Sequence, residues 1–546
     1  MSTARSSLLM ASGTIVSRIL GFVRAVLLAV TIGVTTNAAD AFGIANQLPN
    51  NVYAIIAGGV LNAVLVPQII KARKHKDGGQ GYIDRLVTLI ITGFTIVTVV
   101  TTLAAPFLVS IYTTGWSSDQ LALATAFAYW CLPQLFFYGL YSLFGEILNA
   151  RSAFGPFMWA PVLNNLVAIA GMLAFIVLFG ADPTGHRAIS DWGSEQVILL
   201  AGTATAGVAS QALILLLFWK RIGLKFRLNF GWRGVGLRPA AKAASWTLGM
   251  VLVTQAGGLV QSIVASSTIT ARETGGLAVA SVAAASIGWL VFMLPHSIAT
   301  VSIATASFTK ISQHAHDGDI DALKRDLGAS LRAILAISAF AAATLTVLAY
   351  PIARVFVGEY EATIALGNVI MAMMVGLVSF SFVFMLQRAF YALEDTRTPF
   401  FFTLAQISVF VVGALIIAQT VPAVWLVAAL SLLNSVSITV QAVLAYRLLR
   451  RRIGRFEGVG LAKAATRMIA SGIVAGFAGW AYLHYTGLIA PGGYGLGTVV
   501  GAVLTCIPAG LIMLLVYFVV LALLGVEETW KAWQGVAKAF KGIARR

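Results

Sequence analysis

Long apolar runs recur from one end of this 546-residue chain to the other, and they restrict it to one class of fold. Each run approaches or exceeds the roughly 20 residues that an α-helix needs to cross a bilayer. Only 10% of the residues are charged, whereas soluble domains carry about 25%. The runs lack the alternation of apolar and polar residues that is typical of barrel strands. The sequence therefore predicts an all-α polytopic membrane protein.

We expect fourteen membrane-spanning helices. They are 7–34, 42–70, 84–112, 120–149, 157–180, 197–218, 241–268, 279–308, 328–350, 362–393, 399–420, 424–447, 463–485 and 497–525. Several are longer than a bilayer requires, so we expect them to tilt or to project from the membrane.

The formal net charge of +17 comes from basic residues whose positions follow the topology of the spans. We therefore do not expect nucleic acid as a partner. Lys and Arg residues gather in the loops on one side of the spans, whereas the opposite side has only Arg187, Arg272 and Arg354. The positive-inside rule places the basic side, and both termini, in the cytoplasm, as an even number of spans requires. The tail 526–546 interleaves tryptophans with lysines and predicts an amphipathic helix on the anionic inner leaflet.

A weak internal repeat predicts two similar lobes. Gly145–Phe157 resembles Arg388–Phe400, with Pro156 and Pro399 in register, and 57–71 resembles 296–310. The two offsets, 243 and 239 residues, nearly agree. They predict a lobe at 1–218 and a parallel lobe at 241–447, with two further spans at 463–525, and this arrangement is typical of alternating access. The alternative is a chance recurrence of small residues and prolines.

The first apolar run contains two arginines, Arg18 and Arg24. A guanidinium cannot lose its proton, and each costs roughly 2.5–3.5 kcal/mol at the centre of a bilayer. The two residues lie about 9 Å apart along a helix and about 120° apart around it. This spacing suits a ligand with extended negative charge, such as a pyrophosphate. The alternative is that they snorkel to the cytoplasmic interface, which fits Arg18 better than Arg24.

Polar residues of span 2 and span 10 complete the predicted cavity. Asp40 is either a first-turn acid that the helix dipole favours or a counter-charge at the outer mouth. Asn50 belongs to a polar stretch around Pro49, which predicts a broken helix beside a cavity, or else a passive kink. Arg388 would add positive charge to the cavity floor.

Three further observations on the sequence concern residues outside the predicted cavity. Glu146, Asn149 and Arg151, together with Asn164 and Asn165, predict a structural network that ties spans 4 and 5 together. Catalytic signatures are absent from the sequence, so we expect a transporter and not an enzyme. Cys131 and Cys506 both fall in apolar spans and predict buried thiols.

The N-terminal residues Ser17-Arg18-x-x-Gly21-x-x-Arg24, Asp40-Ala41-Phe42 and Leu48-Pro49-Asn50 resemble the MurJ (MviN) lipid II flippases. These belong to the multidrug/oligosaccharidyl-lipid/polysaccharide exporter superfamily, and the resemblance covers essentially the whole chain. It implies a multi-pass protein of the bacterial inner membrane that moves undecaprenyl-pyrophosphate-linked peptidoglycan precursor to the outer leaflet for cell-wall biogenesis. It also implies substrate-binding roles for Ser17, Arg18, Arg24, Asp40 and Asn50, with Arg388 as a further candidate.

The chain departs from the family pattern at several positions. Ala25 stands where many relatives have Asp, and Leu290 and Met293 stand where many have Arg and Glu before Pro295. We expect no cofactor or metal, and a driving force from membrane potential or an ion gradient. Lipid II, membrane lipids and the cell-wall synthesis machinery are the expected partners. A flippase for another polyprenyl-linked glycan, a drug or cation antiporter of the same fold, and a non-transporting scaffold stay open as alternatives.

Overall fold

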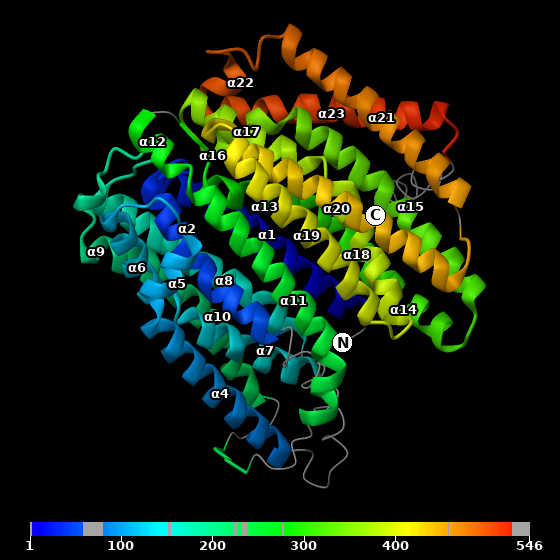
Figure 1. Cartoon of the computed structure of the whole chain (residues 1–546), viewed down its shortest axis with the longest axis horizontal. Coiled ribbons are helices and arrows are strands. Elements are labelled where there is room, and N and C mark those ends of the chain that lie inside the picture. The colour runs from blue at the N-terminus through cyan, green and yellow to red at the C-terminus, as the bar shows by residue number, and fades with distance from the viewer. Residues whose placement is uncertain are drawn as a thin grey trace. The chain divides into compact units, whose positions relative to one another are not determined.

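The structure is a computed structural model that describes residues 3–57, 80–150, 154–221, 227–231, 237–275, 278–456 and 458–526. These residues fold into helices joined by short connections, with no strand among them (Figure 1). Twelve of the described helices are long and apolar enough to cross a membrane. The helix pair Tyr360–Met374 and Leu377–Ala392, bent by 42°, raises the number to thirteen if it counts as one span. The protein is therefore a multi-pass helical membrane protein, as predicted.

The predicted number of fourteen spans stays a prediction. The second predicted span, 42–70, runs into residues 58–79, which lie outside the described part of the chain. The predicted tail helix lies outside it as well, apart from Val526. The other predicted spans agree with the described helices to within a few residues at most ends.

Contacts within the chain divide it into two compact units. Unit 1 comprises Met1–Gly276 with Ser281–Ala283, and unit 2 comprises Leu277–Ala280 with Ala284–Arg546. The helix at Leu237–Ser266, which the repeat assigns to the second lobe, is grouped with unit 1 by its contacts. The predicted lobe boundaries themselves stay a prediction.

Unit 1 is built around helices that pack lengthwise. Its described elements are α1 (Thr3–Ile32), α2 (Asn37–Ile56), α4 (Gln80–Leu103), α5 (Ala105–Tyr112), α6 (Ser118–Cys131), α7 (Gln134–Ala150), α8 (Phe154–Phe179), η2 (Ile189–Asp191), α9 (Ser194–Val197), η3 (Ile198–Gly202), α10 (Thr203–Arg221), α11 (Leu237–Ser266) and α12 (Ile269–Gly275). Helix α8 packs along both α1 and α10, while α2 packs on α6. An apolar core that includes Leu86, Leu143, Ile147 and Trp219 joins α4, α7 and α10.

Two local features position the beginning of α2. Gly33 has a φ of +80° and turns the chain after α1, a conformation that glycine adopts without strain. Thr36 is the N-cap of α2, and its hydroxyl accepts a hydrogen bond of 3.0 Å from the backbone N–H of Ala39. Helix α2 then runs without a break through Pro49 to Ile56. The prediction that Pro49 breaks this helix is therefore wrong for the residues up to Ile56.

Unit 2 has its own core. Its elements are α13 (Val282–Pro295), η4 (His296–Thr300), α14 (Val301–His316), α15 (Ile320–Val347), α16 (Ala349–Phe356), α17 (Tyr360–Met374), α18 (Leu377–Ala392), α19 (Arg397–Thr420), α20 (Ala423–Ile453), α21 (Gly458–Tyr485), α22 (Tyr494–Gly497) and α23 (Val499–Leu523). Residues such as Leu331, Leu386 and Phe390 pack α14, α15, α18 and α20 together. Helices α21 and α23 pack on each other, and α21 also packs on α15.

The two corners of the predicted repeat have the expected local form. Helix α7 ends at Ala150 and α8 begins at Phe154, just before Pro156, while α18 ends at Ala392 and α19 begins at Arg397, just before Pro399. A proline in the first turn of a helix lacks an N–H that would have no partner there in any case. The sequence therefore located both turns.

Candidate functional site

Helix α1 carries three of the predicted site residues along its length. It packs on α8, where the side-chain amide of Asn165 donates to the carbonyl of Ser17 at 2.9 Å and contacts its hydroxyl at 3.4 Å. A Cβ at Gly21 would lie 3.9 Å from the same amide nitrogen, an ordinary van der Waals distance, so this contact does not require glycine. Arg18 is exposed, and it has no hydrogen bond or ion pair within the described residues.

Arg24, two turns further along α1, lies in a more enclosed place. Its side chain is partly buried, in the region of unit 1 that also holds Tyr138 and Cys131. No carboxylate pairs with it in the part of the chain that the structure describes. Because a guanidinium stays protonated, Arg24 is a membrane-depth cation whose charge no described side chain neutralises.

Neutral polar side chains of α2 and α7 form a hydrogen-bonded chain that includes Tyr138. The Tyr138 hydroxyl donates to Gln134 Oε1 at 2.9 Å, and Gln134 Nε2 donates to Asn46 Oδ1 at 3.1 Å. The side chain of Asn50 also approaches the Tyr138 oxygen. We call these four residues, Asn46, Asn50, Gln134 and Tyr138, the amide–phenol wall. Asn50 thus lies near Tyr138, and its predicted place in a cavity shared with Arg24 stays a prediction.

The polar stretch of α2 continues into contacts with two more helices of unit 1. The Asn51 amide donates to the hydroxyl of Tyr112 at 3.1 Å, and Gln255 Nε2 donates to the Asn51 carbonyl at 3.0 Å. Proline at 49 has no N–H, so it leaves the helix carbonyl four residues earlier without its usual donor. The stretch therefore joins α2 to α5 and α11.

Asp40 has a different environment from Arg24. It is completely buried at the start of α2, and its Oδ2 forms an ion pair of 2.9 Å with Arg272 Nη1. The same Nη1 donates to Asn37 Oδ1 at 3.0 Å, and the backbone N–H of Ala283 donates to Asp40 Oδ1 at 2.9 Å. We call Asp40 and Arg272 the buried ion pair, and Asn37 accepts a hydrogen bond beside it. Both oxygens of Asp40 are engaged by this chain, and its assignment as a substrate-contacting residue stays a prediction.

Arg388 belongs to unit 2, on α18, whereas the other predicted site residues belong to unit 1. Its guanidinium lies 4.7 Å from the ring centre of Phe384 and 5.5 Å from that of Phe308. The Nε atom is buried and has no hydrogen-bond partner among the described residues. Aromatic faces attract the cation without neutralising it, so Arg388 also keeps its charge available.

Asn164 and Asn165 do not form the predicted network with span 4. The Asn164 amide donates to Gln211 Oε1 on α10 at 2.9 Å, and Asn165 binds Ser17 on α1. The reason is that α8 packs between these partners more extensively than it packs on α7. Arg151 lies outside the described residues, as does the side chain of Asn149.

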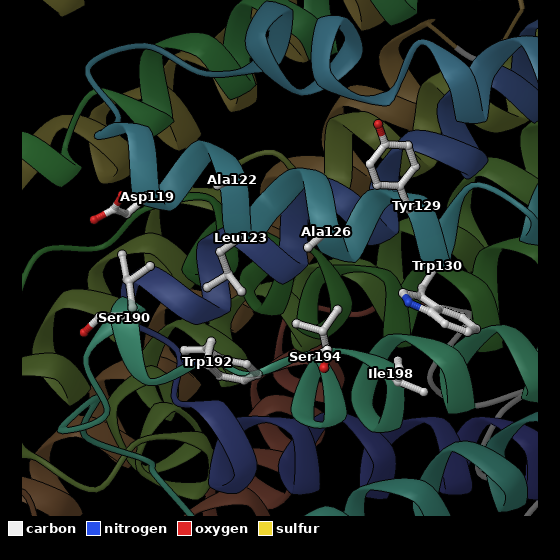
Figure 2. A pocket seen from close by; sticks show the side chains of 12 residues that line it. Asp119, Ala122, Leu123, Ala126, Tyr129, Trp130, Ser190, Trp192, Ser194 and Ile198 are labelled. Atoms are coloured by element: carbon white, nitrogen blue, oxygen red, sulfur yellow. The ribbon is translucent and has the colours of Figure 1, made fainter.

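One cavity in unit 1 lies apart from the arginines. It has a volume of about 540 Å³ and separates α6 from the segment 189–198 (Figure 2). Figure 2 shows Asp119 near one end of α6 and Trp130 near the other, with Trp192 and Ser194 opposite. The lining is mainly apolar and aromatic and includes no cation, so this cavity is not a place for an anionic headgroup.

The side chains that the sequence analysis missed are Gln134, Tyr138 and Arg272. Gln134 and Tyr138 are four residues apart on α7, and so share one helix face within an apolar run. That pattern could have indicated them. Arg272 was recognised only as a charge on the outer side, because a pairing across 232 residues has no local signal.

Comparison with protein families gives a match over most of the chain. A family model described as "Lipid II flippase MurJ" matches residues 28–496. A protein of Rhizobium meliloti (strain 1021) named probable lipid II flippase MurJ is 26% identical over 415 residues, which cover 74% of this chain and 73% of that protein. A protein of the same name from Haemophilus influenzae (strain ATCC 51907 / DSM 11121 / KW20 / Rd) is 26% identical over 412 residues, or 71% of this chain and 75% of that protein.

Solved structures give the same fold. One described as "Lipid II flippase MurJ, inward closed conformation" superposes with a TM-score of 0.69 at 18% identity, covering 94% of this chain and 99% of its own. A multidrug resistance transporter of the MATE family, in the MOP superfamily, superposes with a TM-score of 0.58 at 18% identity, covering 81% of this chain and 99% of its own. Sequence identities this low show a shared fold and leave the substrate open.

Proposed function

Because this chain belongs to the MurJ family of lipid II flippases, we propose that it moves lipid II from the inner to the outer leaflet of the bacterial inner membrane. Lipid II is the peptidoglycan precursor in which a disaccharide peptide is linked to undecaprenyl pyrophosphate. Such transport makes and breaks no covalent bond. It requires a site that attracts the anionic headgroup, and a change of conformation that exposes the site on each side in turn.

The observation that supports this proposal is the environment of Arg24. A cation at membrane depth is costly, and no described carboxylate pairs with it. A pyrophosphate would provide the missing negative charge, and arginine binds it through paired N–H donors. Arg18, exposed on the same helix, would contact the headgroup before or after Arg24, while Ser17 is held against α8.

We also propose an orientation, a driving force and partners. The distribution of Lys and Arg supports cytoplasmic termini. We propose that membrane potential or an ion gradient drives the conformational change without a cofactor. Enzymes of cell-wall synthesis would supply the substrate and consume it after transport.

The test is complementation of a bacterium in which the resident MurJ is depleted. The wild-type chain should restore growth and outward exposure of lipid II. Arg24→Ala should be present in the membrane at the same level and fail to restore either. A full-length, membrane-inserted wild-type chain that does not restore growth would contradict the proposal.

The second candidate is a flippase for another undecaprenyl-pyrophosphate-linked glycan. It is favoured by Leu290 and Met293, which stand in α13 where many relatives carry a charged pair. The pyrophosphate and the lipid are common to both candidates, so the arginines serve either. Failed complementation, together with binding of undecaprenyl pyrophosphate to the purified chain, would favour this second candidate.

A further inference from the structure

The cavity between α6 and the segment 189–198 follows the helix over the depth of one leaflet. It begins at Asp119, in the first turn of α6, and reaches Trp130, eleven residues further along (Figure 2). An α-helix rises 1.5 Å per residue, so this part of α6 is about 16 Å long. Half of the hydrocarbon core of a bilayer is about 15 Å thick. Because Ser118–Leu148 is long and apolar enough to cross a membrane, the cavity starts at headgroup depth and ends among the lipid chains.

The wall opposite α6 is anchored to the rest of unit 1. The backbone N–H of Asp182, in the connection that leads to this wall, donates to the carbonyl of Thr31 at 3.2 Å. The ring of Trp192 lies 5.3 Å from the ring of Phe127 and 5.8 Å from that of Phe175, centre to centre. The cavity is therefore preformed between two elements that the protein itself holds in place.

The interior of the cavity suits an alkyl chain. Large apolar or aromatic side chains of its lining are exposed, namely Tyr129 by 46%, Trp130 by 42% and Ile198 by 45%. Contact with a chain would cover apolar surface that the protein leaves uncovered. The volume of about 540 Å³ falls in the range of roughly 300–1,000 Å³ that is usual for small-molecule sites.

The mouth of the cavity is acidic. Asp119 is the one charged residue of the lining, and it forms no ion pair with the described residues. Asp191 and Glu195, which flank lining residues in the sequence, are exposed as well. The nearby cation Arg187 is already engaged, because its Nη2 donates to the carbonyl of Phe179 at 2.7 Å. The mouth therefore attracts a cationic group and repels an anionic one.

We propose that this cavity is a lipid site for a phospholipid with an ammonium headgroup, as in phosphatidylethanolamine. One acyl chain lies along α6 toward Trp130, and the ammonium group lies at Asp119. The bound chain completes the packing between α6 and the segment 189–198. In the orientation proposed above this end of α6 is the outer one, so the lipid comes from the outer leaflet. The site is separate from the arginines, and the inference does not rest on lipid II transport.

The experiment compares phosphatidylethanolamine with phosphatidylglycerol of identical chains, each with a photoreactive diazirine on one chain, on the full chain in a neutral detergent. Native mass spectrometry measures the affinity for the first lipid bound, and peptide mapping locates the label. Phosphatidylethanolamine should label α6 and the segment 189–198. It should bind about two- to fivefold more tightly than phosphatidylglycerol, which is the size expected for an exposed ion pair.

Two variants separate the chain from the headgroup, and each has a matched control. Ala126 lines the cavity, so the ring of Ala126→Phe should fill it and lower the labelling at least tenfold (Figure 2). Ala418→Phe adds the same ring at an exposed position of α19 and should change nothing. Asp119→Asn should abolish the preference for phosphatidylethanolamine, whereas Glu361→Gln, at a first-turn acid of α17, should keep it. Melting temperatures of all variants report any general loss of folding.

Three outcomes would overturn the inference. Equal binding of the two lipids would mean that the cavity holds ordinary boundary lipid only. Labelling that Ala126→Phe leaves intact would place the lipid outside the cavity. Tighter binding of dodecyltrimethylammonium, which has a chain and a cation but no phosphate, would assign the cavity to soluble cationic amphiphiles instead of a phospholipid.

Discussion

Two charged positions of unit 1 lie sixteen residues apart in the sequence and have opposite environments. Asp40 is completely buried and is matched by Arg272, Asn37 and a backbone N–H. Arg24 is partly buried and forms no ion pair with a described carboxylate. The first charge is neutralised within the protein, and the second is not.

The difference separates a structural role from a binding role. A buried carboxylate with both oxygens engaged has little left to offer a ligand, and removal of its partner leaves an unpaired buried charge. An unneutralised cation, by contrast, can still form a strong electrostatic interaction with an anionic ligand. A charged residue in a membrane span therefore indicates a binding site more strongly when the protein supplies no counter-charge for it.

The largest expected effect is on transport, from Arg24→Met. This variant keeps most of the side chain's length and removes the charge, so we expect at least about 100-fold less lipid II exposure, comparable to loss of a charged binding contact. The melting temperature without substrate should not fall, because the unpaired cation costs roughly 2.5–3.5 kcal/mol at the bilayer centre. A transport assay measures the exposure of lipid II, and thermal unfolding of the purified chain measures the melting temperature. Normal transport by this variant would show that Arg24 has no binding role to set against the structural role of Asp40.

The buried ion pair should give the reverse result. Arg272→Met leaves the Asp40 carboxylate buried and unpaired, so we expect a loss of about 3–5 kcal/mol of stability. The double variant Asp40→Asn with Arg272→Met removes both charges and should recover most of that loss. Thermal unfolding of the three proteins in one detergent makes the measurement. If Arg272→Met melts at the wild-type temperature, the pair does not hold the beginning of α2.

A ligand-dependent measurement sharpens the comparison. Undecaprenyl pyrophosphate at a hundred times its dissociation constant should stabilise the wild type by about 2.7 kcal/mol. The doubly neutralised Asp40/Arg272 variant should gain a similar amount, and Arg24→Met should gain much less. Equal stabilisation of Arg24→Met would mean that the pyrophosphate binds elsewhere, with Arg18 or Arg388 as the next residues to test.

Much of the fold could be predicted because membrane spans are determined by local composition. An apolar run of about 20 residues in a membrane must satisfy its backbone hydrogen bonds internally, and an α-helix does so within a single segment. This is why predicted spans such as 399–420 and 424–447 begin within two residues of α19 and α20. The prolines at 156 and 399 located helix starts for the same local reason.

The site was predicted only in part because its partners come from distant segments. Arg18 and Arg24 are conspicuous, since charge is rare in an apolar run. What surrounds them depends on helix packing: Asn165 contacts Ser17 across 148 residues, and Arg272 pairs with Asp40 across 232. Asp40 looked the same in sequence as an unpaired acid would, and only its contacts distinguish the two.

The smallest expected effect concerns the cap that places Asp40. Thr36→Ala removes the hydroxyl that accepts from Ala39 N, and loss of such a cap costs about 1 kcal/mol. Thr36→Ser keeps the hydroxyl and removes the methyl group, so it separates capping from packing at this nearly buried position. We expect Thr36→Ala to lower the melting temperature more than Thr36→Ser and to leave undecaprenyl pyrophosphate binding unchanged, because Arg24 lies on α1 and not on the helix that this cap begins. Weakened binding in Thr36→Ala would mean that the beginning of α2 and the amide–phenol wall are coupled, and the two charged positions could then no longer be treated as independent.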